Sequence, residues 1–229
     1  MIVRFGLLQK NPSWSDERFA HHWLDDHGPL ARKIPNLRAY RQNHVVDKRQ
    51  LGISHQRGSW QFDGFSQLWF DDHQKMRLGM ASEVAPKLVN DEGQFLGNMH
   101  IIAAESNTVI EPPAEQGAVL KRMSILTRTS GTSDARFRHE WYDVHADLVM
   151  KIPGVRGYRQ NLVTVREREK GVFSEREDLP IDGMVELWFD SVASIEAGFA
   201  SPAGQAAQAH GRTFLAEVTT FLVKEHVIL

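Results

Sequence analysis

The chain has 229 residues, of which 24% are charged and 41% hydrophobic, and its formal net charge at pH 7 is -2. This balance excludes a disordered chain and gives no basic footprint for nucleic acid. The sequence has no cysteine, which excludes disulfides, thiol catalysis, iron–sulfur clusters and cysteine-based zinc sites.

The N-terminal apolar run is too short for the core of a secretory signal, and no run approaches the roughly 18 apolar residues of a membrane span. We therefore expect a cytoplasmic protein with neither a membrane nor a nucleic-acid partner.

Six elements are predicted in chain order in the first part of the sequence. Residues 2–8 form an apolar, strand-like run, and Ser15 is a good N-cap for the helix that follows and that Pro35 ends. Residues 37–46 and the DGFSQLWFD segment then predict two strands, residues 72–91 one or two helices, and residues 94–104 a last strand. The order β-α-β-β-α-β is that of a ferredoxin-like fold.

The same order recurs in the second part of the sequence. Residues 15–43 and 133–161 are identical at 17 of 29 positions, and DGMVELWFD repeats the third strand. We therefore predict two ferredoxin-like repeats, residues 1–108 and 118–229, with residues 109–117 as a linker. The fold class is α+β. Since the strands are apolar on both faces, the two sheets should pack against each other as an intrachain α+β barrel. Two copies of such a fused pseudo-dimer could still associate as a homodimer.

A histidine lies on the apolar face of the first helix in each repeat. Helical spacing places His27 on one stripe with Trp23 and Ile34, and it places His145 on the matching stripe with Trp141. Both imidazoles should face a space between helix and sheet, where burial would tune their basicity. The alternative is a hydrogen-bonded core histidine. Gly28-Pro29 predicts a kink beside His27 that the second copy lacks.

Other polar and aromatic residues recur with the histidines and are candidates for substrate binding, with packing or solvated strand ends as the alternative. These candidates are Trp23 and Trp141, Tyr40 and Tyr158, and Arg41 and Arg159.

The strand, the WxxxH helix with HGPL, the P-x-L-x-x-Y strand and the DG-x-x-x-LWF strand resemble the EthD-like branch of the dimeric α+β barrel proteins. The related methylmuconolactone methylisomerases imply that their catalytic helix histidine falls on His27 and His145. The resemblance also implies a second catalytic histidine in the loop after the second strand. His55 occupies that loop in the first repeat, and the matching loop of the second repeat has no histidine. The AHGRTFL segment implies a role for His210, where the first repeat has Asp91. The resemblance thus favours the first repeat as the working site.

The resemblance and the histidines together predict a cofactor-independent enzyme acting on a small cyclic or aromatic compound by histidine-mediated proton transfer. The reaction could be that of an isomerase, a lyase or an oxygenase in a catabolic pathway. The family's association with oxidative degradation also favours an oxidoreductase. The spacing of the other histidines predicts no metal site. Two alternatives remain: a non-catalytic accessory protein that binds a small molecule, and a haem-binding barrel with an axial histidine.

Overall fold

The structure is a computed structural model that describes residues 1–114 and 119–229. The first repeat contains four strands, β1 (Ile2–Lys10), β2 (Ala39–Asp47), β3 (Gly64–Phe70) and β4 (Leu96–Ile110). Its helical segments are α1 (Asp16–His21), η1 (His22–His27), α2 (Gly28–Ala31), α3 (His73–Met80) and α4 (Ala85–Phe95). The predicted order of elements is confirmed in this repeat.

The second repeat has the same elements and one added strand. Its strands are β5 (Leu120–Arg128), β6 (Gly157–Glu169), β7 (Val172–Phe173), β8 (Gly183–Phe189) and β9 (Leu215–Val227). Its helical segments are α5 (Asp134–Arg138), η2 (His139–His145), α6 (Ala146–Val149), α7 (Val192–Ala200) and α8 (Pro202–Gly211). β4 takes in the first two residues of the expected linker, 109–117, and residues 115–117 lie outside the described part of the chain.

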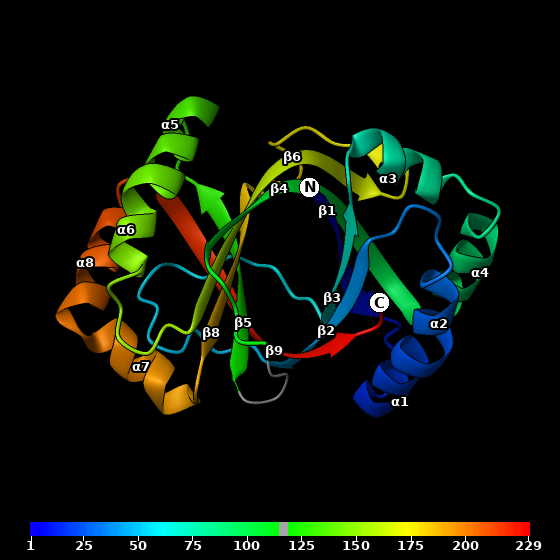
Figure 1. Cartoon of the computed structure of the whole chain (residues 1–229), viewed down its shortest axis with the longest axis horizontal. Helices are drawn as coiled ribbons and strands as arrows, with labels where there is room; N and C mark the ends of the chain where they lie inside the picture. Colours follow the sequence, from blue (N-terminus) through cyan, green and yellow to red (C-terminus); the bar gives the residue numbers. More distant parts are fainter. Residues whose placement is uncertain (115–118) are drawn as a thin grey trace.

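The strands close into one antiparallel barrel. Within each repeat they follow the ferredoxin-like order, β4-β1-β3-β2 and β9-β5-β8-β6. The two sheets join edge to edge where β2 pairs with β9 and β4 pairs with β6, so neither sheet keeps a free edge in the eight-stranded ring. Figure 1 shows the ring with the helices of each repeat stacked outside it on opposite sides. The predicted intrachain α+β barrel is confirmed.

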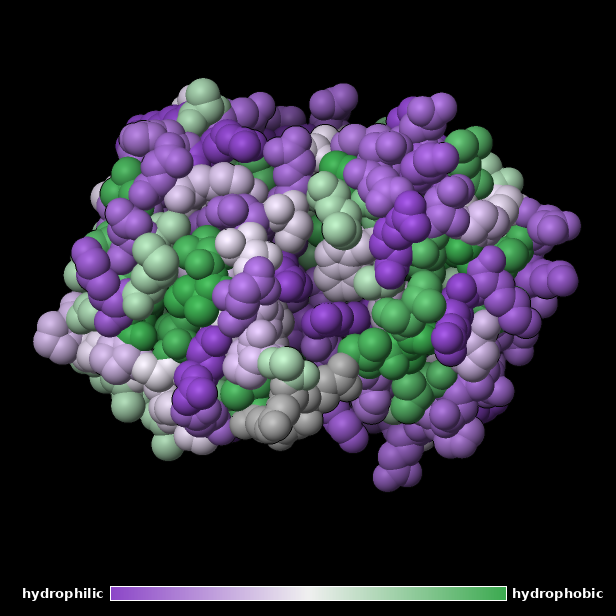
Figure 2. Space-filling view, viewed as in Figure 1, coloured by the Kyte–Doolittle hydropathy of each residue, from purple (hydrophilic) through white to green (hydrophobic). Residues whose placement is uncertain are grey.

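Each strand divides its side chains between the barrel interior and the helices, because successive residues point to opposite faces. In β3, Phe65 and Trp69 belong to the cluster inside the barrel, and Leu68 belongs to the cluster under the first-repeat helices. The face of the molecule seen in Figure 2 is mostly polar, with two separate apolar areas on either side of its centre. No helix among the described residues is long and apolar enough to cross a bilayer.

The first long helix of each repeat contains a π-helical segment whose last residue is the helix histidine. η1 ends at His27 and η2 ends at His145, and both continue directly into α-helix. The prediction of a kink in the first copy alone is wrong, because the second copy adopts the same turn without a proline. Pro29 is the second residue of α2 and follows η1 directly, so the chain passes through the π-helical segment before it reaches the proline.

The tryptophan of each of these helices lies on the glycine that opens the third strand of its repeat. A Cβ at Gly64 would come within 2.3 Å of the Trp23 ring, and one at Gly183 would come within 2.5 Å of the Trp141 ring. The DG-x-x-x-LWF motif therefore serves packing: its glycine lets the tryptophan approach the sheet, and the tryptophan fixes the depth of the helix.

A charged cluster is buried at the centre of the barrel. Lys121 Nζ lies 2.7 Å from Glu186 Oε2 and 2.5 Å from Glu225 Oε2. Gln67 Nε2 donates to Glu186 Oε1 across the pseudo-two-fold axis at 2.9 Å. Burial by itself raises the pKa of Glu186, but Lys121 and Arg159 outweigh it and lower the pKa to about 2. The carboxylate is thus held charged in the interior.

Replacing Lys121 by methionine should destabilise the protein by about 3 kcal/mol, because it removes the cation nearest to Glu186 and leaves that buried carboxylate with Arg159 alone at 3.7 Å. Adding Glu186→Gln should recover most of this loss, since the first repeat carries the neutral pair Val3 and Gln67 at the corresponding positions. Urea unfolding of the two variants measures both effects. A single-variant loss as small as that of the exposed Lys33→Met would contradict the role of Lys121.

Candidate active site

Each helix histidine lies beside a small cavity between the helices and the outer face of the barrel. The cavity beside His145 has a volume of about 60 Å³ and the cavity beside His27 about 30 Å³. A buried water molecule needs about 10–15 Å³ of such a volume, so the cavity beside His145 has room for roughly four to six groups of that size. The expected position of both imidazoles between helix and sheet agrees with the structure.

In the first repeat His27 is paired with a carboxylate. Its Nδ1 lies 2.8 Å from Asp91 Oδ2, and His22 Nε2 lies 2.9 Å from Asp91 Oδ1. Asp91 therefore accepts from both rings, which leaves His27 Nε2 as the basic nitrogen. Burial lowers the pKa of His27, and the bond to Asp91 partly opposes this. The arrangement is that of a carboxylate-supported base in a nearly filled cavity.

The second repeat keeps this chain of three groups but exchanges their chemistry. His210 stands where the first repeat has Asp91, and Glu140 stands where it has His22. His145 Nδ1 lies 3.2 Å from His210 Nδ1, and His210 Nε2 lies 3.1 Å from Glu140 Oε2. If Glu140 accepts from His210 Nε2, then His210 Nδ1 accepts from His145 Nδ1, and His145 Nε2 keeps a free lone pair. Burial first, and then His210 and His55, lower the pKa of His145 to about 3.

His55 does not belong to the site of its own repeat. The loop of residues 48–63, between β2 and β3, crosses to the second repeat, and Gln56 pairs there with Glu217. Figure 1 shows this cyan segment reaching the side of α6 and α8. A Cβ at Gly211 would lie 3.0 Å from the His55 ring and 3.7 Å from the His145 ring, so the two imidazoles flank one glycine. The expectation that His55 supports the first-repeat site is therefore wrong.

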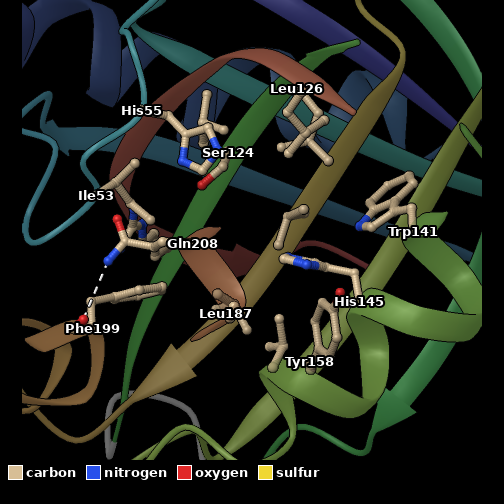
Figure 3. A pocket seen from close by; sticks show the side chains of 16 residues that line it. Ile53, His55, Ser124, Leu126, Trp141, His145, Tyr158, Leu187, Phe199 and Gln208 are labelled. Carbon is tan, nitrogen blue, oxygen red and sulfur yellow. Dashed lines mark hydrogen bonds between the residues drawn. The ribbon is translucent and has the colours of Figure 1, made fainter. Parts of the chain in front are cut away.

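His145 and His55 approach the larger cavity from opposite sides, one from the helix and one from the crossing loop (Figure 3). Both ring nitrogens of His55 are buried and have no hydrogen-bond partner among the described residues. Burial, with a contribution from the charge of Arg212, lowers the pKa of His55. Both histidines are therefore held in the neutral form at neutral pH.

The crossing loop is fixed by side-chain hydrogen bonds to the second repeat. Gln208 Oε1 accepts from the Ser54 backbone at 2.7 Å and from its hydroxyl at 2.8 Å. Gln50 Nε2 donates to the Val218 carbonyl at 2.8 Å. Arg122 donates to the carbonyls of Leu51 and Gln50 at 3.3 and 3.2 Å. The second-repeat cavity is consequently built from both halves of the chain.

The tryptophans and tyrosines lie where the sequence predicts candidate binding residues. Trp141 and Tyr158 line the larger cavity, and Trp23 and Tyr40 line the smaller one. Burial raises the pKa of both tyrosines, which are therefore neutral hydroxyl groups. The indole Nε1 of Trp141 is buried and makes no hydrogen bond of good geometry among the described residues, although it lies close enough to the Tyr158 hydroxyl to lower the pKa of that tyrosine.

Arg41 and Arg159 lie on the opposite face of the sheet. Arg41 donates to Glu225 at 3.0 Å, and Arg159 lies 3.7 Å from Glu186, both inside the barrel. Neither reaches the cavities, because β2 and β6 turn Tyr40 and Tyr158 toward the helices and the next residue the other way. Their prediction as substrate-binding residues for these sites is not supported.

The sequence reasoning missed Arg122 and Gln208, which both line the larger cavity and are 1% and 3% exposed. A signal was present for Arg122: it lies in the apolar strand 119–126 at a position whose alternation matches Leu126, on the helix side. Gln208 gave no such signal, since its role depends on the crossing loop.

The described residues contain no cluster of three or more histidine, aspartate or glutamate side chains suited to a metal ion. Haem does not fit beside either histidine in this conformation, since a benzene-sized ligand already needs a cavity of about 150 Å³ and a porphyrin is much larger.

Comparison with known families agrees with this architecture. A model of the EthD domain matches residues 11–98 and again residues 129–217. The chain belongs to the EthD domain family. It carries two EthD domains in tandem, and together they form the single barrel. No curated protein sequence matches the chain closely enough to count as a relative.

Several solved structures share the fold of this tandem EthD protein. An anthrone oxidase-like protein matches 99% of this chain and 92% of its own, with a TM-score of 0.65 and 12% identity. A candidate monooxygenase from Lactobacillus acidophilus matches 99% of this chain and 94% of its own, with a TM-score of 0.60 and 10% identity. An EthD family protein from Bacillus halodurans is 24% identical over 46% of this chain and 98% of its own, with a TM-score of 0.38. At these identities the first two show the fold.

His145 should make the protein less stable in acid. Its pKa of about 3 in the folded state lies below the usual 6.5, so between these values only the unfolded state binds the proton. Stability should therefore fall as pH drops from about 6.5 toward 3, by roughly 1.4 kcal/mol per pH unit for this group. His145→Gln should flatten the pH dependence of urea unfolding by about that slope. The exposed His139→Gln should leave it unchanged, and equal slopes in all three proteins would contradict the assignment.

Proposed function

We propose that this EthD protein is a cofactor-independent enzyme that moves protons on a small organic compound, and that its reaction site is the cavity beside His145. The observation that carries this proposal is the convergence of His145 and His55, from different halves of the chain, on one largely apolar cavity. A neutral imidazole can take a proton from a bound molecule and return it as imidazolium, while a second neutral imidazole on the opposite side can donate a hydrogen bond to the anion that forms.

The proton can be followed through this site. The free lone pair of His145 Nε2 takes a proton from a carbon or hydroxyl of the substrate, which leaves the substrate as its anion and the ring as imidazolium. Return of that proton from the His145 imidazolium to another atom of the substrate anion gives an isomer and restores the neutral ring. His210 Nδ1 lies against His145 Nδ1, and Glu140 lies behind His210, so the two groups fix the orientation of the His145 ring.

The apolar walls suit a small, mostly apolar substrate, as expected from the sequence. Trp141, Tyr158 and Phe199 supply most of the aromatic lining, and Leu187 and Val218 add aliphatic surface. A ring-sized compound exceeds the present cavity, so its entry would require the hydrogen bonds from Gln208 to the loop 48–63 to open. The names of two structural neighbours, an oxidase-like protein and a candidate monooxygenase, agree with an oxygen-dependent member of this reaction class.

The first-repeat site is the weaker candidate despite its Asp91–His27 pair. Its cavity has half the volume, and the corresponding loop of the second repeat brings no histidine to it. Lys170 from that loop is instead bound to Glu92 at 2.6 Å.

A second candidate function is binding without conversion, as an accessory protein. The low pKa of His145 favours it, because a nitrogen with a pKa of about 3 is a weak base. The two functions differ in whether a bound compound exchanges protons with solvent.

The test is hydrogen–deuterium exchange into small lactones and cyclic ketones in D2O, followed by proton NMR. His145→Gln and His55→Gln should each slow the exchange by about 100-fold or more, which is the usual contribution of an acid–base group. His27→Gln is the matched control, because it changes the equivalent histidine of the other repeat, and it should exchange at the wild-type rate. Equal loss in all three variants, or exchange by none of the four proteins, would overturn the proposal.

A further inference from the structure

The larger cavity contains a buried cation with no counter-ion. Arg122 is 1% exposed and lines the cavity, yet no carboxylate of the described residues lies within ion-pairing distance of it. Its two bonds to the loop carbonyls satisfy part of the guanidinium, and Phe199 lies 4.8 Å below it. Its Nε remains buried without a partner. A buried charge of this kind is costly unless an opposite charge accompanies it.

The equivalent arginine of the first repeat is placed differently. Arg4 is also buried and lines the smaller cavity, but Glu92 lines it too, and the charges of Glu92 and Glu167 act on Arg4. At the position of Glu92 the second repeat has Gly211. The second repeat has thus lost the carboxylate and kept the arginine.

The remaining polar groups of the larger cavity agree with this change. None of the side chains that line this cavity is acidic. Apart from Arg122, the polar side chains that line it carry no charge at neutral pH. Besides Arg122 Nε, the His55 ring nitrogens and Trp141 Nε1 are buried without a hydrogen bond of good geometry among the described residues; His55 lies beside the Gly211 backbone and Trp141 beside the Tyr158 hydroxyl. Ser124, where the first repeat has Gly6, adds a hydroxyl to the same wall. The unused hydrogen-bonding capacity is therefore mostly that of donors next to a positive charge.

We propose that the cavity beside His145 binds a small organic carboxylate, with its charged oxygens toward Arg122 and its apolar part against the aromatic walls. The anion supplies the charge that Arg122 lacks and accepts from the unpartnered donors. Chains of four or five non-hydrogen atoms match the volume of about 60 Å³. A small organic carboxylate would then be the substrate class of the proposed proton-transfer reaction. Binding of the carboxylate does not depend on that reaction; only its conversion after binding does.

Isothermal titration calorimetry with propionate and with propionamide tests this on the intact protein, because the two probes share their shape and differ in charge. Propionate should bind about 10- to 100-fold more tightly than propionamide, the ratio expected for a charged hydrogen-bond pair. Arg122→Met should lose that preference, and Arg122→Lys should keep part of it. Arg4→Met is the matched control and should bind propionate as the wild type does.

Equal binding of the two probes by the wild type, no binding of propionate at about 10 mM, or undiminished binding by Arg122→Met would overturn the proposal. If Arg122→Met fails to fold, the wild-type comparison and Arg122→Lys still decide it. Propionate binding that depends on Arg122 in a protein that exchanges no substrate protons would refute the proposed reaction and leave the anion site standing. Proton exchange into a substrate by a protein that binds propionate no better than propionamide would refute the anion site and leave the proposed reaction standing.

Discussion

The pairing of each repeat's edge strands with those of the other repeat is the constraint on which the rest of the structure depends. Unpaired strand edges expose rows of backbone donors and acceptors, and the inner face of each sheet is apolar. The β2–β9 and β4–β6 pairings remove both problems at once, since they close the ring and bury the two inner faces against each other. Neither repeat has this option alone, which explains why they are held in one chain.

Closing the ring also decides where the chemistry lies. β2 ends beside β9, so the loop that follows it runs over the second repeat, where His55 and Ile53 line the cavity and Leu51 joins the core. The interior of the ring is filled by apolar side chains and the Lys121 charge cluster. The cavities are therefore outside the ring, under the helices, and the one beside His145 takes residues from both halves of the chain.

The two sites differ in the charged groups around their histidine and arginine. The first keeps Asp91 and Glu92 near its histidine and arginine, while the second replaces them with His210 and Gly211. Gly211 has two effects: it removes the counter-charge of Arg122, and it leaves room for the His55 ring. A change at two adjacent positions thus separates a self-neutralised, nearly filled site from one that can accept an anion.

Most of the fold could be predicted from the sequence, because periodicity and caps are local and the repeat states each element twice. Ser15 and Ser133 accept from the backbone of Arg18 and Arg136, as their capping positions indicate. The position of the helix histidines followed from helical spacing in the same way. The membership of His55 in the opposite site could not be predicted, because it depends on the path of a loop across the barrel. The π-helical turns have no signal in side-chain spacing, and both copies share them.

The central claim is that one site, built from both halves, lies beside His145 rather than beside His27. A crystal structure of the protein soaked with a small carboxylate tests it most directly. The account predicts a bound molecule next to Arg122, in contact with His55 and His145, and none in the first-repeat cavity. A molecule bound beside His27 and Arg4, with the cavity at His145 unchanged, would contradict it.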